Sequence, residues 1–489
     1  MKNTFTKLLS LALALILALG VLAACTGNNG GDNTNKHPDV RTDEADVLKG
    51  ITGDTIWVGN TAGTTGGLAG IGKPFNLGIQ AAFDVYNKAG GYNGKSIKLK
   101  HYDDGGLAEN SGTLLEKLIH EDEVFALVGH FGSYAVDVTL ETLIDEEVPM
   151  IYAAAGNEEL LNEAANTLGE MGIVPIQPLN KTEGRMLILR AFAPADKGGL
   201  AAKKVGVIAN SNEASQSLLA GIKDEMAGLP ADKRDNVIIQ EVSSTDYSAA
   251  VNALKAAGCD VVVLTVIGAD YLTALTTMAN VDYKCTVLTS YNNANAAVFN
   301  LNNALQEQYY SVFETMNIFA QAWLDISSTE YVYKDETSAL YNMYAAFGLN
   351  NGGAGVAGFT EEYWEVANNI YNYAVSINDP TAFAMSYDSY ALAGYIAGNL
   401  FCQAMEELEK SGLPLARANL VHILESKEYK IAMADALSFA NGMRSGVQSF
   451  ALTWVFDANL VDSTKAHQAT SATVHGLMSI EDYRALLNQ

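Results

Sequence analysis

The chain has 489 residues, 49% of them hydrophobic, and a formal net charge of −26 at pH 7. A surface this acidic repels a phosphate backbone and excludes nucleic acid as a partner; it indicates solubility and does not by itself indicate a cationic ligand. The length exceeds that of one average domain, so we expect two lobes with large cores.

The first 25 residues have the pattern of a bacterial lipoprotein signal. Lys2 and Lys7 give a positive start, and the apolar run Leu8–Leu22 is too short for a comfortable membrane span. The run closes in Ala23-Ala24-Cys25, where small residues directly precede a cysteine. We therefore expect cleavage before Cys25 and lipidation of its thiol, which anchors a soluble domain. The alternatives are an ordinary secretory signal with a chance cysteine, or a single transmembrane anchor.

Residues 26–50 are predicted to form a disordered tether. They carry Gly, Asn, Asp and Thr and too few apolar side chains to fold. No second apolar stretch of about 18 residues follows, so no later membrane span is expected. These features predict an extracytoplasmic protein that meets the membrane only through its lipid.

From Thr55 the chain alternates predicted strands and helices, which is typical of a parallel sheet with right-handed crossovers. The predicted strands are Thr55–Asn60, Ser96–Tyr102, Val124–Val128 and Val148–Tyr152. One predicted helix has Pro74 in its first turn, where a missing N–H is tolerated. The other two are Leu107–His120 and Ala135–Glu146.

A second series of the same kind follows. Its predicted strands are Lys204–Ala209, Val237–Val242, Val261–Val266 and Thr286–Ser290, and its helices are Glu213–Met226, Tyr247–Ala257 and Tyr271–Ala279. We therefore predict an α/β fold with two doubly wound parallel-sheet lobes joined by a hinge, lobe 1 beginning at residue 51 and lobe 2 covering 181–300.

After residue 300 the pattern becomes helical and aromatic. A strand over Ser311–Phe319 is predicted to lead back to lobe 1. Helices are predicted over Ala382–Lys410, Leu415–Ser426 and Tyr429–Ser438, a strand over Gln448–Phe456, and a turn at Asp457–Asn459. Residues 301–445 are thus assigned to lobe 1, with an insertion within 301–380, and residues 446–489 to C-terminal strands of lobe 2.

Cysteine and histidine spacing does not favour a metal site. Cys259, Cys285 and Cys402 have neither CxxC spacing nor a histidine close by. Free buried thiols are expected, and a disulfide between Cys259 and Cys285 is the alternative. His101, His120 and His130 do not pair at metal-ligand spacing either.

Enzyme motifs are also missing from the sequence. No GxSxG, HExxH or P-loop occurs, and the glycines of Gly66–Gly72 lack dinucleotide-loop spacing. Asp103-Asp104 could suggest a metal, but two carboxylates that end a strand are more often helix caps or surface groups. We expect neither catalysis nor a cofactor.

Several short stretches are informative through their order and spacing. They are Gly78–Lys95, Asp103-Asp104, Val128–Ser133, Val148–Ile151, Ala153–Leu160, Thr245–Ser248, Ala256–Leu264 and Gly268–Asp270. Together they resemble the type I periplasmic solute-binding proteins of the leucine/isoleucine/valine-binding class, clearly over 51–300 and weakly over 380–460. The resemblance implies the capture component of an ABC importer. Its lobes would close around a small solute, an amino acid or related compound, for a permease and its ATPases.

Two turns are candidates for contact with the solute. Ligands of doubly wound folds bind beyond the carboxyl ends of the strands, where helix N-termini favour an anionic group. At Gly129–Ser133, Gly132 lets the backbone approach and the Ser133 hydroxyl can donate, unless Ser133 is only an N-cap. At Ala155–Asn157, Gly156 exposes backbone N–H groups.

By resemblance, an α-carboxylate would bind Ser133 and the backbone of Ala155 and Gly156. The family often has Thr where this chain has Gly156, so one hydroxyl contact is missing. An acid of lobe 2 would neutralise the ligand's ammonium. Asp270 matches best by position and Glu213 second, and the alternative for Asp270 is a cap of its own helix.

Other residues near these turns have open roles. The first loop adds Leu68 and Ile71, the latter where relatives often carry an aromatic residue. Tyr134, Tyr152 and Tyr247 either line the site or pack. Three other functions stay open: a sensor for an extracellular signalling receptor, a secreted enzyme on the same scaffold, and a binding protein for an amide, urea or aromatic acid.

Overall fold

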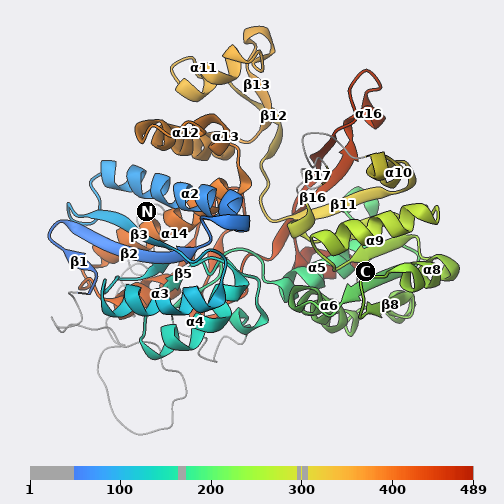
Figure 1. Ribbon diagram of the computed structural model, residues 1–489, viewed down its shortest axis with the longest axis horizontal. Coiled ribbons are helices and arrows are strands. Elements are labelled where there is room, and N and C mark those ends of the chain that lie inside the picture. Colours follow the sequence, from blue (N-terminus) through green and yellow to red (C-terminus); the bar gives the residue numbers. More distant parts are fainter. Residues whose placement is uncertain (1–48, 164–171, 295–298, 300–306, 488–489) are drawn as a thin grey trace, which may run out of the picture. The chain divides into compact units, whose positions relative to one another are not determined.

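The structure is a computed structural model that describes residues 49–163, 172–294, 299 and 307–487 (Figure 1). The predicted signal peptide, the lipidation site at Cys25 and nearly all of the tether lie outside the described residues. Within the described part of the chain, no helix has both the length and the apolar character needed to cross a membrane.

Lobe 1 is built on a six-stranded sheet with the order β1-β2-β4-β5-β6, and with β3 paired to β2. Its strands are β1 (Ile51–Thr52), β2 (Thr55–Ala62), β3 (Ser96–Asp103), β4 (Leu127–Val128), β5 (Met150–Ile151) and β6 (Ile173–Val174). All pairs are parallel except β1 with β2.

Neighbouring residues of the short central strands point to opposite faces of this sheet. Val128 and Ile151 pack in the core that contains α2 (Ala69–Lys88) and α14 (Ser389–Ser411). Leu127 and Met150 pack instead with the residues of α3 (Ala108–His120) and α4 (Ser133–Asp145). Both faces are therefore covered by helices, as a parallel sheet requires.

Lobe 2 is built on a seven-stranded sheet with the order β17-β16-β11-β10-β9-β7-β8. Its strands are β7 (Val205–Asn210), β8 (Val237–Val242), β9 (Val261–Leu264), β10 (Thr286–Thr289), β11 (Asn317–Ala322), β16 (Ser449–Asp457) and β17 (Ala469–Ser479). The pairs from β8 to β11 are parallel, whereas β16 and β17 are antiparallel.

Helices cover both faces of this sheet as well. Val261 and Val263 face the core shared with α5 and α6, and Val262 and Leu264 face the core shared with α8, α9 and α10. The helices of this lobe are α5 (Asn180–Phe192), α6 (Glu213–Met226), α7 (Ala231–Arg234), α8 (Ser248–Ala257), α9 (Ala269–Asn280), α10 (Glu307–Thr315), α16 (Ala458–Val461) and α17 (Ile480–Leu487). The predicted fold of two doubly wound lobes is confirmed.

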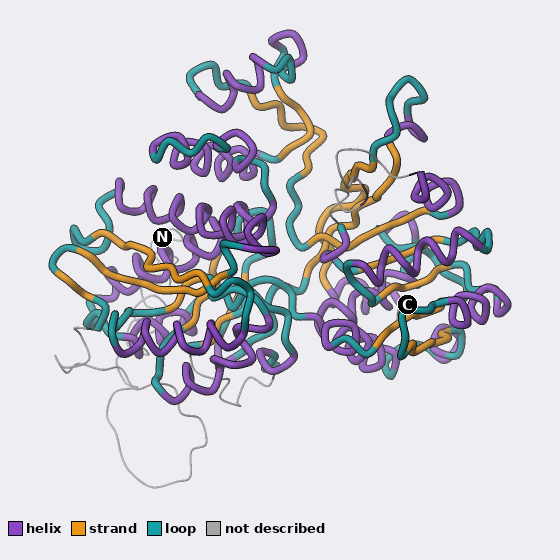
Figure 2. The backbone as a smooth tube through the Cα atoms, viewed as in Figure 1, coloured by secondary structure: helices purple, strands orange, loops and turns teal. Residues whose placement is uncertain are grey.

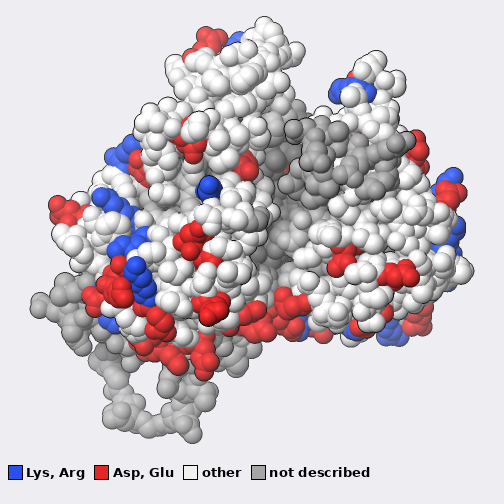
Figure 3. Space-filling view, viewed as in Figure 1, with Lys and Arg blue, Asp and Glu red and all other residues white. Residues whose placement is uncertain are grey.

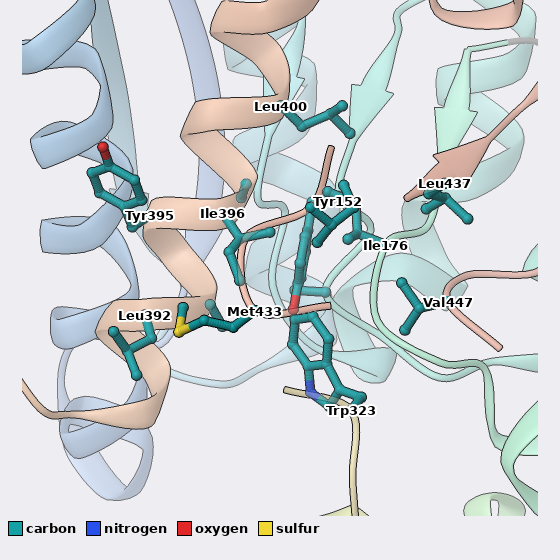
Figure 4. Close-up of a cluster of buried hydrophobic side chains, with 14 of the residues drawn as sticks. Tyr152, Ile176, Trp323, Leu392, Tyr395, Ile396, Leu400, Met433, Leu437 and Val447 are labelled. Carbon is teal, nitrogen blue, oxygen red and sulfur yellow. The ribbon is translucent and has the colours of Figure 1, made fainter. Parts of the chain in front are cut away.

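The chain passes between the two sheets three times, after β6, after β11 and before β16. Each passage contributes a buried side chain to one cluster around Tyr152, namely Ile176, Trp323 and Val447 (Figure 4). The passages are also joined through the backbone, because Val447 N donates to Ile176 O (2.9 Å).

The stretch between β11 and α14 forms additional elements on lobe 1 (Figure 2). They are β12 (Ser327–Tyr333), α11 (Ala339–Ala346), β13 (Val356–Phe359), α12 (Glu361–Ser376) and α13 (Ala382–Met385). Their small core is aromatic, with Tyr333 stacked on Trp364 at 4.2 Å between ring centroids. α12 packs on α2, and Tyr373 Oη donates to Gln80 Oε1 (3.1 Å).

The first helix begins earlier than predicted. α2 starts at Ala69, so Pro74 lies inside it rather than in its first turn. The glycines of Gly66–Gly72 do not form an open loop. A Cβ at position 72 would lie 2.4 Å from Gly63 O, so the close approach of two backbone segments explains that glycine.

The predicted strand Ser311–Phe319 is wrong. Residues up to Thr315 are helical, and β11 begins at Asn317 and pairs with β10, so this segment extends the sheet of lobe 2 instead of leading to lobe 1. Val312 and Phe313 are buried in the core beside α9, and this tertiary packing decides the helix.

Three further expectations near the C-terminus are corrected. The predicted helix Tyr429–Ser438 is instead the antiparallel pair β14 (Glu428–Tyr429) and β15 (Leu437–Ser438). The predicted long helix Ala382–Lys410 is broken, because Asp388 caps α14 by accepting bonds from Tyr390 N and Ala391 N. The turn predicted at residues 457–459 opens the one-turn helix α16, and α15 covers Arg417–Ser426.

The three cysteines of the described residues are free thiols. Cys259 and Cys402 are buried, and Cys285 is half-buried. No group of three or more potential metal ligands occurs within the described ranges.

Candidate ligand-binding turns at the carboxyl ends of the strands

The turns that follow β4 and β5 lie side by side in lobe 1. Phe131 and Ala154 form a parallel bridge. Gly132 N donates to Ala154 O (3.1 Å), and Ala154 N donates to His130 O (3.1 Å). The structure therefore brings the turn of Gly132 and Ser133 next to the turn of Ala155 and Gly156, at the carboxyl ends of adjacent parallel strands.

Gly132 and Ser133 open α4 without a side-chain cap. Gly132 is the N-cap residue, with φ 102° and ψ 139°, a conformation that side chains rarely adopt. Ser133 is the first helical residue, so the alternative role of Ser133 as N-cap is wrong. The Ser133 hydroxyl is half-buried at the start of a helix, where backbone N–H groups lack intrahelical acceptors.

Tyr134 is held inside lobe 1. Its hydroxyl donates to Asp104 Oδ1 (3.0 Å), and Asp104 also accepts from Ser111 Oγ (2.8 Å) and Gly106 N (2.8 Å). Burial first, and the charge of Asp104 second, raise the pKa of Tyr134. Leu68 lies at the N-cap of α2 and packs against Gly106, where a Cβ would meet Leu68 Cδ1 at 2.8 Å.

The two acids that end β3 behave differently. Asp104 is 0% exposed, so the expectation of a cap or surface position is wrong for it. Asp103 is exposed and accepts from Thr65 Oγ1 (2.6 Å), which lowers the pKa of Asp103 to about 2. Hydrogen bonds to these two carboxylates thus hold the loop between β2 and α2 and the start of α3 in place.

Gly156 is buried against the first residue of α5. Asn180 N donates to Gly156 O (3.0 Å). A Cβ at position 156 would lie 2.6 Å from Asn180 Oδ1, so Asn180 occupies the space that a side chain at 156 would need. Sequence reasoning missed Asn180.

The acids predicted for lobe 2 lie at the carboxyl ends of their strands. Asp270 is in the first turn of α9, after β9, and its Oδ2 accepts from Asn210 Nδ2 (2.9 Å). Gly268 is the N-cap of α9, so the alternative role of Asp270 as that cap is wrong. Tyr247 is buried beside Asp270, and burial is the main cause that raises the pKa of Tyr247 to about 12.

Glu213 is the exposed first residue of α6, after β7. Partial desolvation of its carboxyl group by neighbouring atoms raises the pKa of Glu213, and the carboxylates of Glu159 and Asp137 raise it further. Acidic side chains also gather over the α3 and α4 side of lobe 1 (Figure 3). Glu213 therefore lies near other acids, Glu159, Asp137 and Glu158.

His130 supports the turn after β4 from inside the lobe. It is 0% exposed, with Nδ1 3.4 Å from Thr61 N and Nε2 3.0 Å from Thr139 Oγ1. Since Thr139 Oγ1 donates to Ala135 O (2.6 Å), His130 Nε2 is assigned as the donor and Nδ1 as the acceptor. Burial lowers the pKa of His130 to about 4.

We expect acid to destabilise the protein through His130. The pKa of His130 is lower in the folded protein than its ordinary value of 6.5. The free energy of unfolding therefore has its full value above pH 6.5 and decreases by about 3 kcal/mol as the pH falls toward 4. Urea unfolding at pH 7, 5.5 and 4.5 measures it. His130→Gln should flatten this part of the profile, whereas His120→Gln, at an exposed helix end, should not. An unchanged slope in His130→Gln would contradict the assignment.

Glu183 is a buried acid at the start of α5 that sequence reasoning also missed. It is 0% exposed and accepts from Ser290 Oγ (2.7 Å) and Tyr291 N (2.7 Å) at the end of β10. Burial raises the pKa of Glu183 to about 7, against the opposing effect of these hydrogen bonds and of Arg190.

The expected pH dependence of Glu183 has the opposite direction. The pKa of Glu183 is higher in the folded protein than its ordinary value near 4.5. Its contribution to the free energy of unfolding is therefore complete below pH 4.5 and decreases by about 3 kcal/mol as the pH rises through 7. Glu183→Gln should therefore show a flatter free energy of unfolding between pH 5 and 8.5 than the natural protein. Equal slopes for the two proteins would refute this reading.

Residues 55–317, more than half of the chain, match the family described as periplasmic binding protein. The chain therefore belongs to that family, and the resemblance to its leucine/isoleucine/valine-binding class is confirmed.

Curated relatives of the chain carry names of the same class of binding protein. An "Amino acid binding protein" of Pseudomonas aeruginosa is 24% identical over 220 residues, covering 45% of this chain and 53% of the relative. A "Leu/Ile/Val-binding protein homolog 2" of Brucella abortus is 27% identical over 225 residues, covering 44% and 55%. The chain spans about half the length of the curated relatives it matches.

Solved structures show the same fold at low identity. An ABC transporter substrate-binding protein from Sphaerobacter thermophilus has a TM-score of 0.59 at 15% identity, covering 88% of this chain and 99% of that one. A fatty acid ABC transporter substrate-binding protein from Thermomonospora curvata has 0.57 at 16%, covering 89% and 95%. A solute binding protein from Rhodopseudomonas palustris, in complex with 3,4-dihydroxy benzoic acid, has 0.55 at 16%, covering 88% and 98%.

Proposed function

We propose that the protein is the extracytoplasmic solute-binding component of an ABC importer. It captures an amino acid or a related small polar solute between its two lobes and delivers it to a permease and its ATPase subunits. The observation that carries this proposal is the pair of adjacent turns after β4 and β5, which bring the start of α4 at Ser133 next to Gly156 at the carboxyl ends of parallel strands.

We propose the following roles for the site residues. Ser133, Ala155 and Gly156 bind the polar head of the solute through a hydroxyl and backbone groups, and Gly132 lets the solute approach. Asp270 binds a donor group of the solute in this proposal, since an acid at this edge attracts an ammonium, and Glu213 is a second candidate. Leu68 and Tyr134 shape the lobe 1 side.

The mature protein is proposed to be anchored through a lipid on Cys25, with residues 26–50 as a tether. Lobe 1 would comprise residues 51–180 and the return up to 445, and lobe 2 residues 181–300 and 446–489. β11 adds residues beyond 300 to the sheet of lobe 2. The solute is released unchanged, without a cofactor.

A thermal-shift screen tests the proposal. Full-length protein purified in detergent is assayed with amino acids, amides, aromatic acids, sugars and nucleosides. A solute at 100 times its dissociation constant stabilises the folded state by about 2.7 kcal/mol, and we expect one chemical group to raise the melting temperature and to be recovered unchanged. No rise with any compound, from folded and ligand-free protein, would refute solute capture.

Asp270→Asn tests the role of the lobe 2 acid. If the solute carries an ammonium, the variant should bind it at least tenfold more weakly, because the opposite charge is lost. Asp282→Asn, in the exposed turn after α9, is the matched control and should bind normally. Unchanged affinity for an ammonium-bearing solute in Asp270→Asn would exclude the proposed charge pairing.

A further inference from the structure

Gly156 and Asn180 form one packed unit. The carboxamide of Asn180 stands where a side chain at 156 would be, with Oδ1, Cγ and Nδ2 at 2.6, 2.8 and 2.9 Å from the ideal Cβ position. Asn180 is 4% exposed, and its backbone N–H donates to Gly156 O. The amide of Asn180 in α5 therefore fills the space that a side chain of residue 156 would occupy in the turn after β5.

A second amide adjoins the same glycine. Asn157 is 1% exposed, and its Nδ2 donates to Asp137 Oδ1. A carboxylate only accepts, so this bond fixes the orientation of the Asn157 amide. Asn157 Oδ1 is left without a donor among the residues that the structure describes.

The Asn180 side chain makes no hydrogen bond within the described ranges, and its amide atoms, unlike Asn157 Oδ1, are not fully buried although the residue is 4% exposed. A buried polar group that lacks a partner costs about 1–3 kcal/mol. Asn157 Oδ1 is such a group, and the Asn180 amide lies against the same glycine. These two amides, at the carboxyl end of β5, indicate a partner that arrives with the solute.

The chemistry of these groups restricts that partner. Asn157 Oδ1 accepts only, so it needs a donor, while the Asn180 amide can both donate and accept. A carboxylate supplies no donor for Asn157 Oδ1, and its oxygens would be repelled by that oxygen. The nearest cation along the chain, Lys181, pairs with Glu158 (3.0 Å) and Asp224 (3.1 Å).

We propose that Asn157 and Asn180 determine specificity by binding an uncharged group of the solute that both donates and accepts, as a primary amide does. This inference rests on the proposed function and narrows its substrate class. The solute then presents an amide, rather than a carboxylate alone, to the turn at Gly156.

Matched acid and amide pairs test the inference. Full-length protein in detergent is titrated calorimetrically at pH 7 with benzoate and benzamide, isovalerate and isovaleramide, and leucine and leucinamide. We expect the amide of at least one pair to bind at least tenfold more tightly than its acid. Asn180→Ala should reduce that preference below threefold, and Asn180→Ser serves if the first variant does not fold.

Asn236→Ala is the matched control, because Asn236 precedes β8 and its Nδ2 donates to Asp232 O (2.7 Å), away from the turn. It should keep the amide preference. Acids that bind as tightly as their amides, or a preference that survives in Asn180→Ala, would overturn the inference and leave solute capture intact. No binding by any pair, together with no hit in the wider screen, would instead overturn the proposed function.

Discussion

Gly394→Val is expected to lower the free energy of unfolding by about 3 kcal/mol or more, because it forces two helices apart. A Cβ on Gly394 of α14 would lie 1.9 Å from Phe75 O of α2. On the other side of the same crossing, a Cβ on Gly78 would lie 2.0 Å from Ala391 O. The obstacles are backbone atoms, which cannot move aside as a flexible side chain can.

The same substitution should weaken solute binding. Phe75 packs on Phe131 with ring centroids 5.0 Å apart, and Phe131 directly precedes Gly132. A displaced α2 therefore disturbs the turn after β4.

Urea unfolding followed by circular dichroism measures the effect, and Gly394→Ala is used if the valine variant does not accumulate. Gly112→Ala in α3 is the control, since nothing lies within 4 Å of its Cβ position. That control should gain about 0.5–1 kcal/mol from the better helix former. A Gly394→Val protein as stable as the natural one would show that the helices do not cross so closely.

Arg444→Met should cost about 3–5 kcal/mol, because it removes one partner of a buried ion pair. Arg444 is 2% exposed, and its Nη2 lies 2.6 Å from Glu425 Oε1. The guanidinium also donates to Ile173 O (2.6 Å) in β6. Arg444 thereby ties the segment before β16 to the edge of lobe 1.

The double variant Arg444→Met with Glu425→Gln separates charge from packing. It should recover part of the loss, since the buried carboxylate that has lost Arg444 is replaced by a neutral amide. Arg234→Met removes a surface pair with Asp235 and should change stability by less than about 1 kcal/mol. Equal free energies of unfolding for Arg444→Met and Arg234→Met would rule out a structural role for the buried pair of Arg444 and Glu425.

Much of the fold could be predicted because parallel strands covered on both faces are continuous apolar runs. All four residues of Val261–Leu264 are buried, and this strand was predicted from its sequence. The strand Ser311–Phe319 was wrong because tertiary packing decided it, and the helix Tyr429–Ser438 was wrong because the chain forms a local hairpin there. α10 is fixed by the core beside α9, and Tyr429 is fixed by its pairing with Leu437.

The sequence predicted only those candidate site residues that directly follow a predicted strand. Ser133 and Gly156 follow predicted strands, so their edge of the sheet could be inferred. Asn180 could not, because its contact with Gly156 forms only when α5 packs against the turn after β5. Burial of Asp104 and Glu183 likewise depends on neighbours that are distant in sequence, Tyr134 and Ser290.

The most direct test of solute capture is a calorimetric titration of full-length protein with the solute that gives the largest thermal shift. We expect one solute per chain, recovered chemically unchanged, and a tenfold or greater loss of affinity in Ser133→Ala with the fold intact. Ser376→Ala, at the exposed end of α12, should bind like the natural protein. Absence of binding heat with every candidate, or full affinity in Ser133→Ala, would contradict a solute site at the turns after β4 and β5.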